Sequence, residues 1–403
     1  MHLTLLSNIL SAIGAFGLTI VFSRYLPSTE FAKIAVWSSL FSWGQFIISL
    51  SGPGFVAKAT VMGGRDKGAN SIVAILHYVF LAALACSLVW FLIVIPMNAF
   101  LAMYNEFFVF SCVLACLTAI QSSLSGYYRF LEQHNCANLI QVLFSMGTLI
   151  SSYILAASGS LNLEHRVTVP AAVLLAIFFL YKPGLLPILR RFRILTLSEI
   201  YGFIRYSVEY FGHSVAHTIV GGLDRLVLSG HVNAVSLGNY HVIKQGAESV
   251  RIIGQAIQSQ LAPHFLKYFH AKDHEKLKSV GRKFILYLTA GTIFAFFIPI
   301  TLFIFSGRSV GLETIVVGLV LVIANSVYST YDFKNLPWSL SKGFSLSARS
   351  VCICLLYASA IYAFSNRITP SGMSFLYLGF TSTLLLSTLA ALNWRRSNEK
   401  KGK

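Results

Sequence analysis

Seven Asp, Glu, Lys and Arg side chains fall within two consecutive apolar stretches, residues 203–229 and 237–260. They are Arg205, Glu209, Asp224, Arg225, Lys244, Glu248 and Arg251. Four are cations and three are carboxylates, so one positive charge remains after pairing. A cation left over in apolar surroundings is suited to holding an anionic group such as a phosphate. These residue types therefore predict a site that can hold an anionic headgroup.

Their spacing places the charges on two helix faces. In the first stretch polar side chains recur every four residues: Arg205, Glu209, His213 and His217. In the second they recur at alternating intervals of three and four: His241, Lys244, Glu248, Arg251 and Gln255. Each series forms one stripe along an α-helix. Two polar stripes on consecutive helices predict a shared aqueous wall.

A cluster of internal salt bridges is the structural alternative. Lys244 and Glu248 are spaced i,i+4, and Glu248 and Arg251 are spaced i,i+3, which are the pairing distances on a helix. A charge at the centre of a membrane helix costs about 2.5–3.5 kcal/mol, so these groups face protein or water in either case. Asp224, Arg225 and Arg205 lie near the ends of their stretch, where a location at the membrane interface is as good an interpretation as a functional role.

The elements that carry these stripes are predicted to be transmembrane helices. Of the 403 residues, 56% are hydrophobic and only 11% are charged, and the mean hydropathy is +0.70. Runs of about 20 apolar residues match a hydrocarbon core of roughly 30 Å. We find twelve such runs, near residues 3–23, 31–51, 71–95, 107–127, 137–157, 167–187, 203–229, 237–260, 284–305, 310–330, 346–364 and 374–393. The sequence therefore predicts an all-α polytopic membrane protein.

The distribution of basic residues predicts the orientation of these helices. The chain has 31 Lys and Arg and a formal net charge of +17. With the N-terminus in the cytoplasm, 21 of them fall in inner loops and the C-terminal tail, and four fall in outer loops: Arg24, Arg166, Arg308 and Arg367. This asymmetry is the positive-inside pattern. It predicts two cytoplasmic termini and explains the positive charge by topology and anionic lipid headgroups, without a nucleic-acid partner.

The connection 188–202 divides the predicted helices six and six. We therefore expect two six-helix bundles, residues 1–193 and 194–403, the second with a cytoplasmic tail. Residues 21–37 align without a gap on 227–243, with identities at Val21/Val227, Ser23/Ser229 and Val36/Val242. Halves of six spans keep the same orientation and are related by a pseudo-twofold axis along the membrane normal. Two bundles facing each other across a cleft are the expected arrangement.

One long connection has a pattern of its own. Residues 261–283 include "FLKYFHAKDHEKLKSVGRK", whose mixture of basic and apolar side chains predicts an amphipathic helix lying on the inner leaflet. The six cysteines fall within or at the ends of predicted spans, and Cys112 and Cys116 have no His or carboxylate beside them. We therefore expect no metal site.

Two segments resemble a known family. They are "SNILSAIGAFGLTIVFSRYLPSTEFAKIAV" (7–36) and "GGLDRLVLSGHVNAVSLGNYHVIKQGAESV" (221–250). The shared elements are the Arg-Tyr-Leu turn followed by Phe31, and the Asp224-Arg225 helix end followed by Leu-Gly-Asn-Tyr at 237–240. The chain is similar in these to polysaccharide-biosynthesis membrane proteins of the O-antigen flippase type, within the multidrug/oligosaccharidyl-lipid/polysaccharide exporter superfamily.

The resemblance implies a function and a set of site residues. The implied function is translocation of an undecaprenyl-diphosphate-linked oligosaccharide from the inner to the outer leaflet of the bacterial cytoplasmic membrane, by alternating access coupled to an H⁺ or Na⁺ gradient. Polysaccharide polymerase and chain-length proteins are the implied partners, and no cofactor is implied. Substrate contacts are expected from Lys244, Arg251, Arg225, Arg205 and Arg24. Ion coupling or pairing is expected from Glu248, Asp224 and Glu209.

Two other functions are alternatives. A cation-coupled multidrug exporter of the same superfamily would share the fold, but a cavity for organic cations should be acidic and aromatic, whereas this stripe is net basic. A membrane-embedded polysaccharide polymerase, ligase or acyltransferase would present an acid, a base or a nucleophile at the substrate. In the outer loops only Glu164 lies beside a histidine, His165. We therefore expect a transporter and not an enzyme.

Overall fold

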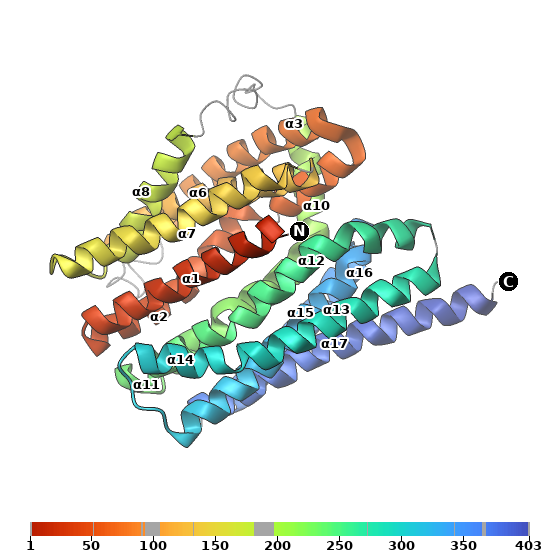
Figure 1. Cartoon of the computed structure of the whole chain (residues 1–403). Coiled ribbons are helices and arrows are strands. Elements are labelled where there is room, and N and C mark those ends of the chain that lie inside the picture. The colour runs from red at the N-terminus through yellow and green to blue at the C-terminus, as the bar shows by residue number, and fades with distance from the viewer. Residues whose placement is uncertain are drawn as a thin grey trace. The chain divides into compact units, whose positions relative to one another are not determined.

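The computed structural model describes residues 2–50, 52–89, 92, 105–131, 133–180, 197–271, 273–341, 343–364 and 368–401. In these residues the regular structure is helical (Figure 1). The helices are α1 (His2–Tyr25), α2 (Ser28–Ser49), α3 (Gly52–Val89), α6 (Asn105–Phe130), α7 (His134–Ala157), α8 (His165–Leu180), α10 (Leu197–Ser229), α11 (Ala234–Ala247), α12 (Ser249–His270), α13 (His274–Ala295), α14 (Phe297–Phe305), α15 (Leu312–Ser341), α16 (Gly343–Phe364) and α17 (Pro370–Lys401).

The chain forms two compact units. The first unit comprises His2–Ser214 and the second Val215–Lys403, so the division falls inside α10. The expected boundary after residue 193 lies outside the described residues.

In the first unit α1 packs along α7 and α3 packs along α6. Small residues allow the first of these contacts. A Cβ placed on Gly14 would lie 2.8 Å from backbone atoms of Ser145, and one placed on Gly17 would lie 2.8 Å from the Leu149 side chain. Glycine is therefore required where the two helices approach closely, as in other membrane helix pairs.

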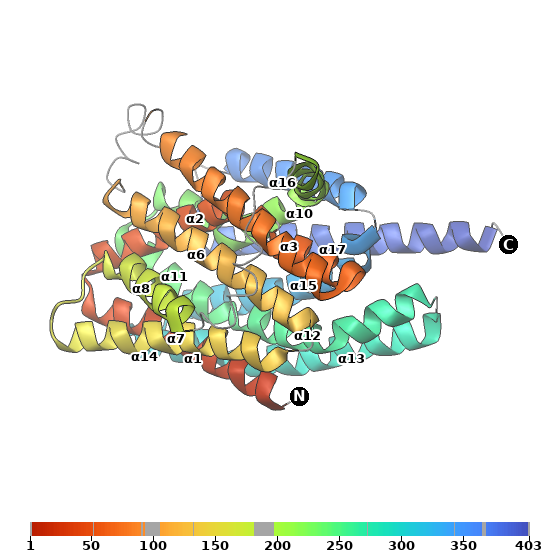
Figure 2. The same ribbon diagram turned by 90° about the horizontal axis from the view of Figure 1, so that it is seen from above.

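The chain reverses direction within α3. Gly64 has a φ of +69°, which side chains with a Cβ rarely adopt. A Cβ on Gly68 would lie 2.3 Å from Thr60 Oγ1, whereas residues eight apart in a straight helix are about 12 Å apart. Figure 2 shows the sharp bend in α3. The two arms of α3 thus belong to different candidate spans, Ser28–Thr60 and Gly64–Leu88.

The second unit is organised around α15. This helix packs against α17, α12, α11, α13 and α16. Its Asn325 donates to the carbonyl oxygen of Ala247 at 3.3 Å and accepts from the Tyr377 hydroxyl at 3.1 Å. At the α11–α14 contact a Cβ on Gly246 would lie 2.5 Å from Pro299 Cα. A buried amide and a close glycine contact therefore hold α11 against α15 and α14.

Each of the twelve predicted apolar runs overlaps a described helix. The eighth run is divided at Glu248 into α11 and α12, and the ninth is divided at Phe296 into α13 and α14. Among the described residues, seven helical segments are long and apolar enough to cross a membrane. The prediction of an all-α polytopic membrane protein is thus confirmed.

The prediction of an amphipathic helix over 261–283 is wrong. α12 continues to His270 and α13 begins at His274, and the two helices pack against each other. Asp273 caps α13 by accepting a hydrogen bond from the backbone N–H of Lys276 at 3.1 Å, which lowers the pKa of its carboxyl. The basic residues of this segment therefore lie at the end of α12 and the start of α13. This position explains why their pattern resembled that of a helix on the membrane surface.

Candidate functional site

A buried ion pair joins α10 to α11 in the second unit. The Lys244 ammonium lies 2.6 Å from Asp224 Oδ2 and 2.7 Å from Oδ1, and it donates to the carbonyl oxygen of Val220 at 3.0 Å. Both charged side chains are 0% exposed. Removing one partner of such a pair typically costs about 3–5 kcal/mol, because the other charge stays buried. Each of the two charges therefore depends on the other to remain buried.

The Tyr240 hydroxyl and the backbone N–H of Arg225 also donate hydrogen bonds to the Asp224 carboxylate. The Tyr240 hydroxyl donates to Asp224 Oδ2 at 2.6 Å, and the backbone N–H of Arg225 donates to Oδ1 at 2.8 Å. The Tyr377 ring of α17 faces the ammonium, with its centroid 5.1 Å from Nζ. The carboxylate thus receives hydrogen bonds from one ammonium, one hydroxyl and one amide.

Arg225 and His241 form the adjoining part of this cluster. The Arg225 guanidinium donates to the carbonyl oxygen of Gly221 and contacts His241 Nδ1 at 3.0 Å. Arginine has no acceptor, so Nδ1 is the acceptor and the neutral imidazole carries its proton on Nε2. Both side chains are buried. Arg225 therefore lies inside the helix packing, although it is a cation.

Local sequence explains why these groups meet. Tyr240 and Lys244 are four residues apart on α11, as Val220 and Asp224 are on α10, so each pair shares a helix face. The connection between the helices is short, and the Asn233 side chain caps α11 by accepting from the Ser236 N–H at 2.8 Å. A short connection makes the two helices antiparallel neighbours, which brings the two polar faces together.

A second cluster surrounds Arg251 on α12. Its guanidinium contacts His217 Nε2 at 3.1 Å and lies 5.5 Å from the centre of the Tyr328 ring. His217 Nδ1 is 2.9 Å from the Tyr328 hydroxyl. Because arginine only donates, Nε2 accepts and a neutral His217 donates from Nδ1 to Tyr328. Arg251 is half-buried and His217 is exposed, so this cationic group is accessible from outside the helix packing.

The structural alternative, in which Glu248 pairs with Lys244 and Arg251, is not found among the described residues. Lys244 pairs instead with Asp224, and Glu248 accepts a hydrogen bond from Gln245 Nε2 at 3.3 Å. Glu248 is the residue between α11 and α12 and is half-buried. The cross-helix contact to Asp224 therefore replaces the contact expected along one helix.

Three of the predicted site residues lie in the first unit. Arg205 and Glu209 form an i,i+4 pair with 3.7 Å between Nε and Oε1, and their side chains are 71% and 34% exposed. Arg24 is exposed in the last turn of α1. An exposed pair of this kind contributes little to stability. Their predicted roles in substrate contact or coupling stay predictions.

The predicted stripe on α11 and α12 changes its surroundings along its length. His241 and Lys244 are buried, Glu248 and Arg251 are half-buried, and Gln255 is exposed. The part near α10 is therefore sealed in this structure, and the part beyond Glu248 is accessible. The shared aqueous wall stays a prediction. Substrate contacts by Lys244 and Arg225 also stay predictions, and in this structure both side chains form hydrogen bonds within the second unit.

Sequence reasoning missed the aromatic members of both clusters. Tyr240 could have been found, since it lies four residues before Lys244 on the same face. Tyr328 and Tyr377 come from α15 and α17, more than 75 residues further along the chain, and no local spacing links them to the charges. Within the described part of the chain, no group of three His, Cys, Asp or Glu side chains is arranged to hold a metal ion.

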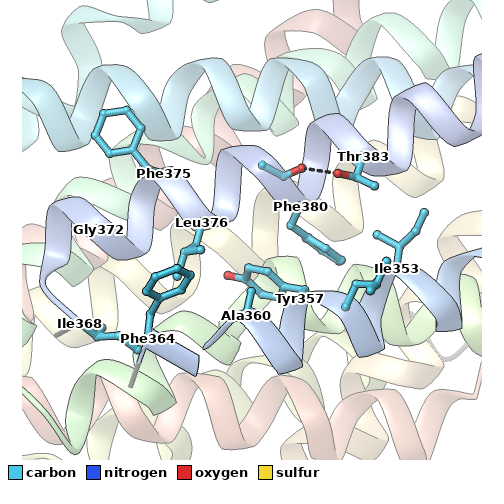
Figure 3. Close-up of a pocket in the computed structure, with 12 residues that line it drawn as sticks. Ile353, Tyr357, Ala360, Phe364, Ile368, Gly372, Phe375, Leu376, Phe380 and Thr383 are labelled. Carbon is cyan, nitrogen blue, oxygen red and sulfur yellow. Dashed lines mark hydrogen bonds between the residues drawn. The ribbon is translucent and has the colours of Figure 1, made fainter. Parts of the chain in front are cut away.

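An apolar groove lies between α16 and α17 (Figure 3). Its volume is about 520 Å³ and its lining is largely aliphatic and aromatic, including Ile353, Phe364 and Leu376. The Tyr357 ring stacks on Phe380 with centroids 4.5 Å apart. Tyr357 is buried, and its hydroxyl has no hydrogen-bond partner among the described residues. The groove thus offers an apolar surface for a hydrocarbon chain.

Comparison with solved structures identifies the fold. The chain is similar to an inward-facing multidrug resistance MATE family transporter of the MOP superfamily, with a TM-score of 0.65 and 12% identity, over 96% of this chain and 94% of that one. It is also similar to a point mutant of the Vibrio cholerae MATE transporter VcmN, with a TM-score of 0.63 and 13% identity, over 99% and 97%. No family model and no curated protein matches the sequence.

These similarities define the class of protein. The chain is an all-α polytopic membrane protein. It has the fold of the MATE transporters, in which twelve helices form two bundles. At 12–13% identity the similarity concerns the fold alone. The transporter fold expected from the resemblance is confirmed at this level, and membership of the O-antigen flippase type stays a prediction.

Proposed function

We propose that the protein is an ion-coupled membrane transporter that exports an amphipathic organic substrate by alternating access. The observation that carries the proposal is the MATE fold, which extends over nearly the entire chain. One of the similar structures is a multidrug resistance transporter. Buried charges within the membrane helices support it, because such charges are costly and usually mark substrate or ion pathways. The functional analogy favoured by the fold is therefore a cation-coupled multidrug exporter.

A second candidate is the flippase for an undecaprenyl-diphosphate-linked oligosaccharide. Arg251 favours it, because a half-buried guanidinium held by His217 and Tyr328 attracts a diphosphate and repels an organic cation. A transporter of this kind holds the polar headgroup away from lipid while the prenyl tail stays in the membrane. On this proposal the protein acts in the bacterial inner membrane, alongside polysaccharide polymerase and chain-length proteins.

The sign of the substrate charge separates the two candidates. We propose to reconstitute the wild type and Arg251→Gln into proteoliposomes and to measure two activities. One is proton- or sodium-driven movement of an organic cation such as ethidium. The other is movement of a fluorescent polyprenyl-diphosphate sugar between leaflets. Arg349→Gln is the matched control, because Arg349 is also half-buried but donates to the Ser387 carbonyl oxygen on α17.

The expected results differ in direction. For an exporter of organic cations, Arg251→Gln retains or increases ethidium movement, because a repulsive charge is removed. For a flippase, Arg251→Gln lowers movement of the diphosphate by about tenfold or more, as loss of one charge-assisted hydrogen bond predicts. Arg349→Gln changes neither. A wild-type protein that moves neither probe under either gradient would contradict both candidates.

A further inference from the structure

The ammonium of Lys244 fills a site lined by oxygen atoms. Its three N–H groups meet Asp224 Oδ1 at 2.7 Å, Asp224 Oδ2 at 2.6 Å and the Val220 carbonyl oxygen at 3.0 Å. On another side it faces the Tyr377 ring. Carboxylate and carbonyl oxygens are also the ligands that hard metal cations prefer. A small cation in place of the ammonium would therefore find the ligands it needs.

At Asp224 one monovalent cation can replace another without a change in local charge. Asp224 supplies one negative charge and Lys244 supplies one positive charge, while Tyr240 donates to the carboxylate as a neutral hydroxyl. The Arg225 guanidinium is directed to His241 and to the Gly221 carbonyl oxygen. A sodium ion carries the same charge as the ammonium, so replacing one by the other leaves the local charge unchanged.

We infer that Lys244 is a tethered cation that occupies the place of a free coupling cation at Asp224. Secondary transporters bind coupling ions within the membrane through carboxylate and backbone carbonyl oxygens. Here those oxygens are taken by the chain's own side chain, with neither partner exposed. Sodium therefore binds at Asp224 only after the ammonium is removed. This inference rests on the proposed ion-coupled transport, and it assigns the role of this one site.

The test is sodium binding by a variant that lacks the ammonium. Purified Lys244→Ala and wild type are unfolded thermally in detergent, in sodium chloride or in choline chloride at equal concentrations. A ligand that binds only the folded state raises the unfolding midpoint with its concentration. We expect Lys244→Ala to be stabilised by sodium relative to choline, with a midpoint that rises over the titration. The wild type is expected to unfold at the same temperature in both salts.

Two control variants identify the site. Lys244→Met fills the space with an uncharged chain, so sodium should have no specific effect on it. The double variant Lys244→Ala/Asp224→Asn lacks the carboxylate and should also not respond. Equal midpoints for Lys244→Ala in sodium and choline would overturn the inference. A second outcome would also overturn it: sodium stabilises the wild type, and Asp224→Asn abolishes this stabilisation. A free cation would then already bind at Asp224 beside Lys244.

Poor folding of Lys244→Ala is itself informative. Recovery of monodisperse variant from sodium buffer but not from choline buffer supports the inference, and loss from both counts against it. Lys244→Ser, which leaves a hydroxyl oxygen in the site, provides a second variant for the same measurement. The readout is binding and not transport. A wild type that moves no substrate ends the proposed function and leaves a sodium response of Lys244→Ala unaffected.

Discussion

Lys244 of α11 pairs with Asp224 of α10, with 2.6 Å between Nζ and Oδ2 and no exposure of either side chain. The two residues are 20 positions apart in the chain and lie on consecutive helices. Their contact divides the charges of this region into a sealed group and an accessible group around Arg251. This division makes the consequences of single substitutions different for the two groups.

Asp224→Asn is expected to destabilise the protein by about 3–5 kcal/mol, because it leaves the Lys244 ammonium buried without a counter-charge. Glu209→Gln, the equivalent change in an exposed pair on the same helix, should cost about 0–1 kcal/mol. Thermal unfolding in detergent measures both. Lys244→Met in the Asp224→Asn background should recover part of the loss, since no unpaired charge then remains. Equal effects of the two single substitutions would contradict this prediction.

Gly14→Ala is expected to destabilise the first unit by about 1–3 kcal/mol, since its methyl group would overlap backbone atoms of Ser145 on α7. Gly44→Ala is the control, because a Cβ there meets nothing within 4 Å. In the α2 helix this control should be neutral or stabilising by up to about 1 kcal/mol. The measurement is again the unfolding midpoint in detergent. An unaffected Gly14→Ala would show that α1 and α7 do not pack as described, and a destabilised Gly44→Ala would show that the surroundings of Gly44 are not open.

Ala360→Phe is expected to reduce binding of lipid by the groove between α16 and α17, because Ala360 lines this groove and the added ring occupies its volume. Leu355→Phe on the same helix is the control, since Leu355 is exposed and is not part of the lining. Native mass spectrometry of protein purified in mild detergent would count the retained lipids. Retention of the same number by both variants would indicate that no hydrocarbon chain occupies the groove.

Orientation in the membrane is tested by reporter fusions. Alkaline phosphatase fused after Gly159 or Gly307 is expected to be active, because the distribution of Lys and Arg places these connections outside. Fusion after Ala271 should be inactive, and green fluorescent protein on the C-terminus should fluoresce. The opposite pattern would invert the predicted topology and exclude two cytoplasmic termini.

The helices were predictable from the sequence for a simple physical reason. A membrane helix needs a run of about 20 apolar residues, and that requirement is local. Helix ends were less predictable. The segment 261–283 looked amphipathic because two packed helices, α12 and α13, both carry basic residues where they end. The charge pattern of a short segment does not distinguish one helix on the membrane surface from the adjoining ends of two packed helices.

The partners of the charges were only partly predictable. Spacing predicted Lys244 and Glu248 on one side of a helix, but spacing within one helix does not tell which neighbouring helix a side chain contacts. Asp224 is 0% exposed and offers both oxygens to Lys244, whereas Glu248 lies at the junction of α11 and α12 and is half-buried. A fully buried ammonium is stabilised more by a buried carboxylate that offers both oxygens, as Asp224 does, than by a half-buried one such as Glu248. Tertiary packing therefore decided between the two acids.

The turn at Gly64 has a consequence for the surface of the molecule. Arg65 and Lys67 are exposed directly after it, in the first turn of the second arm, where backbone N–H groups have no carbonyl partner four residues earlier in the same arm. Proteolytic nicking concentrates at loop tips with exposed, unpaired backbone. Arg65 and Lys67 thus place two trypsin sites beside a break in the helix, and limited digestion is expected to cut at this bend before it cuts within either arm.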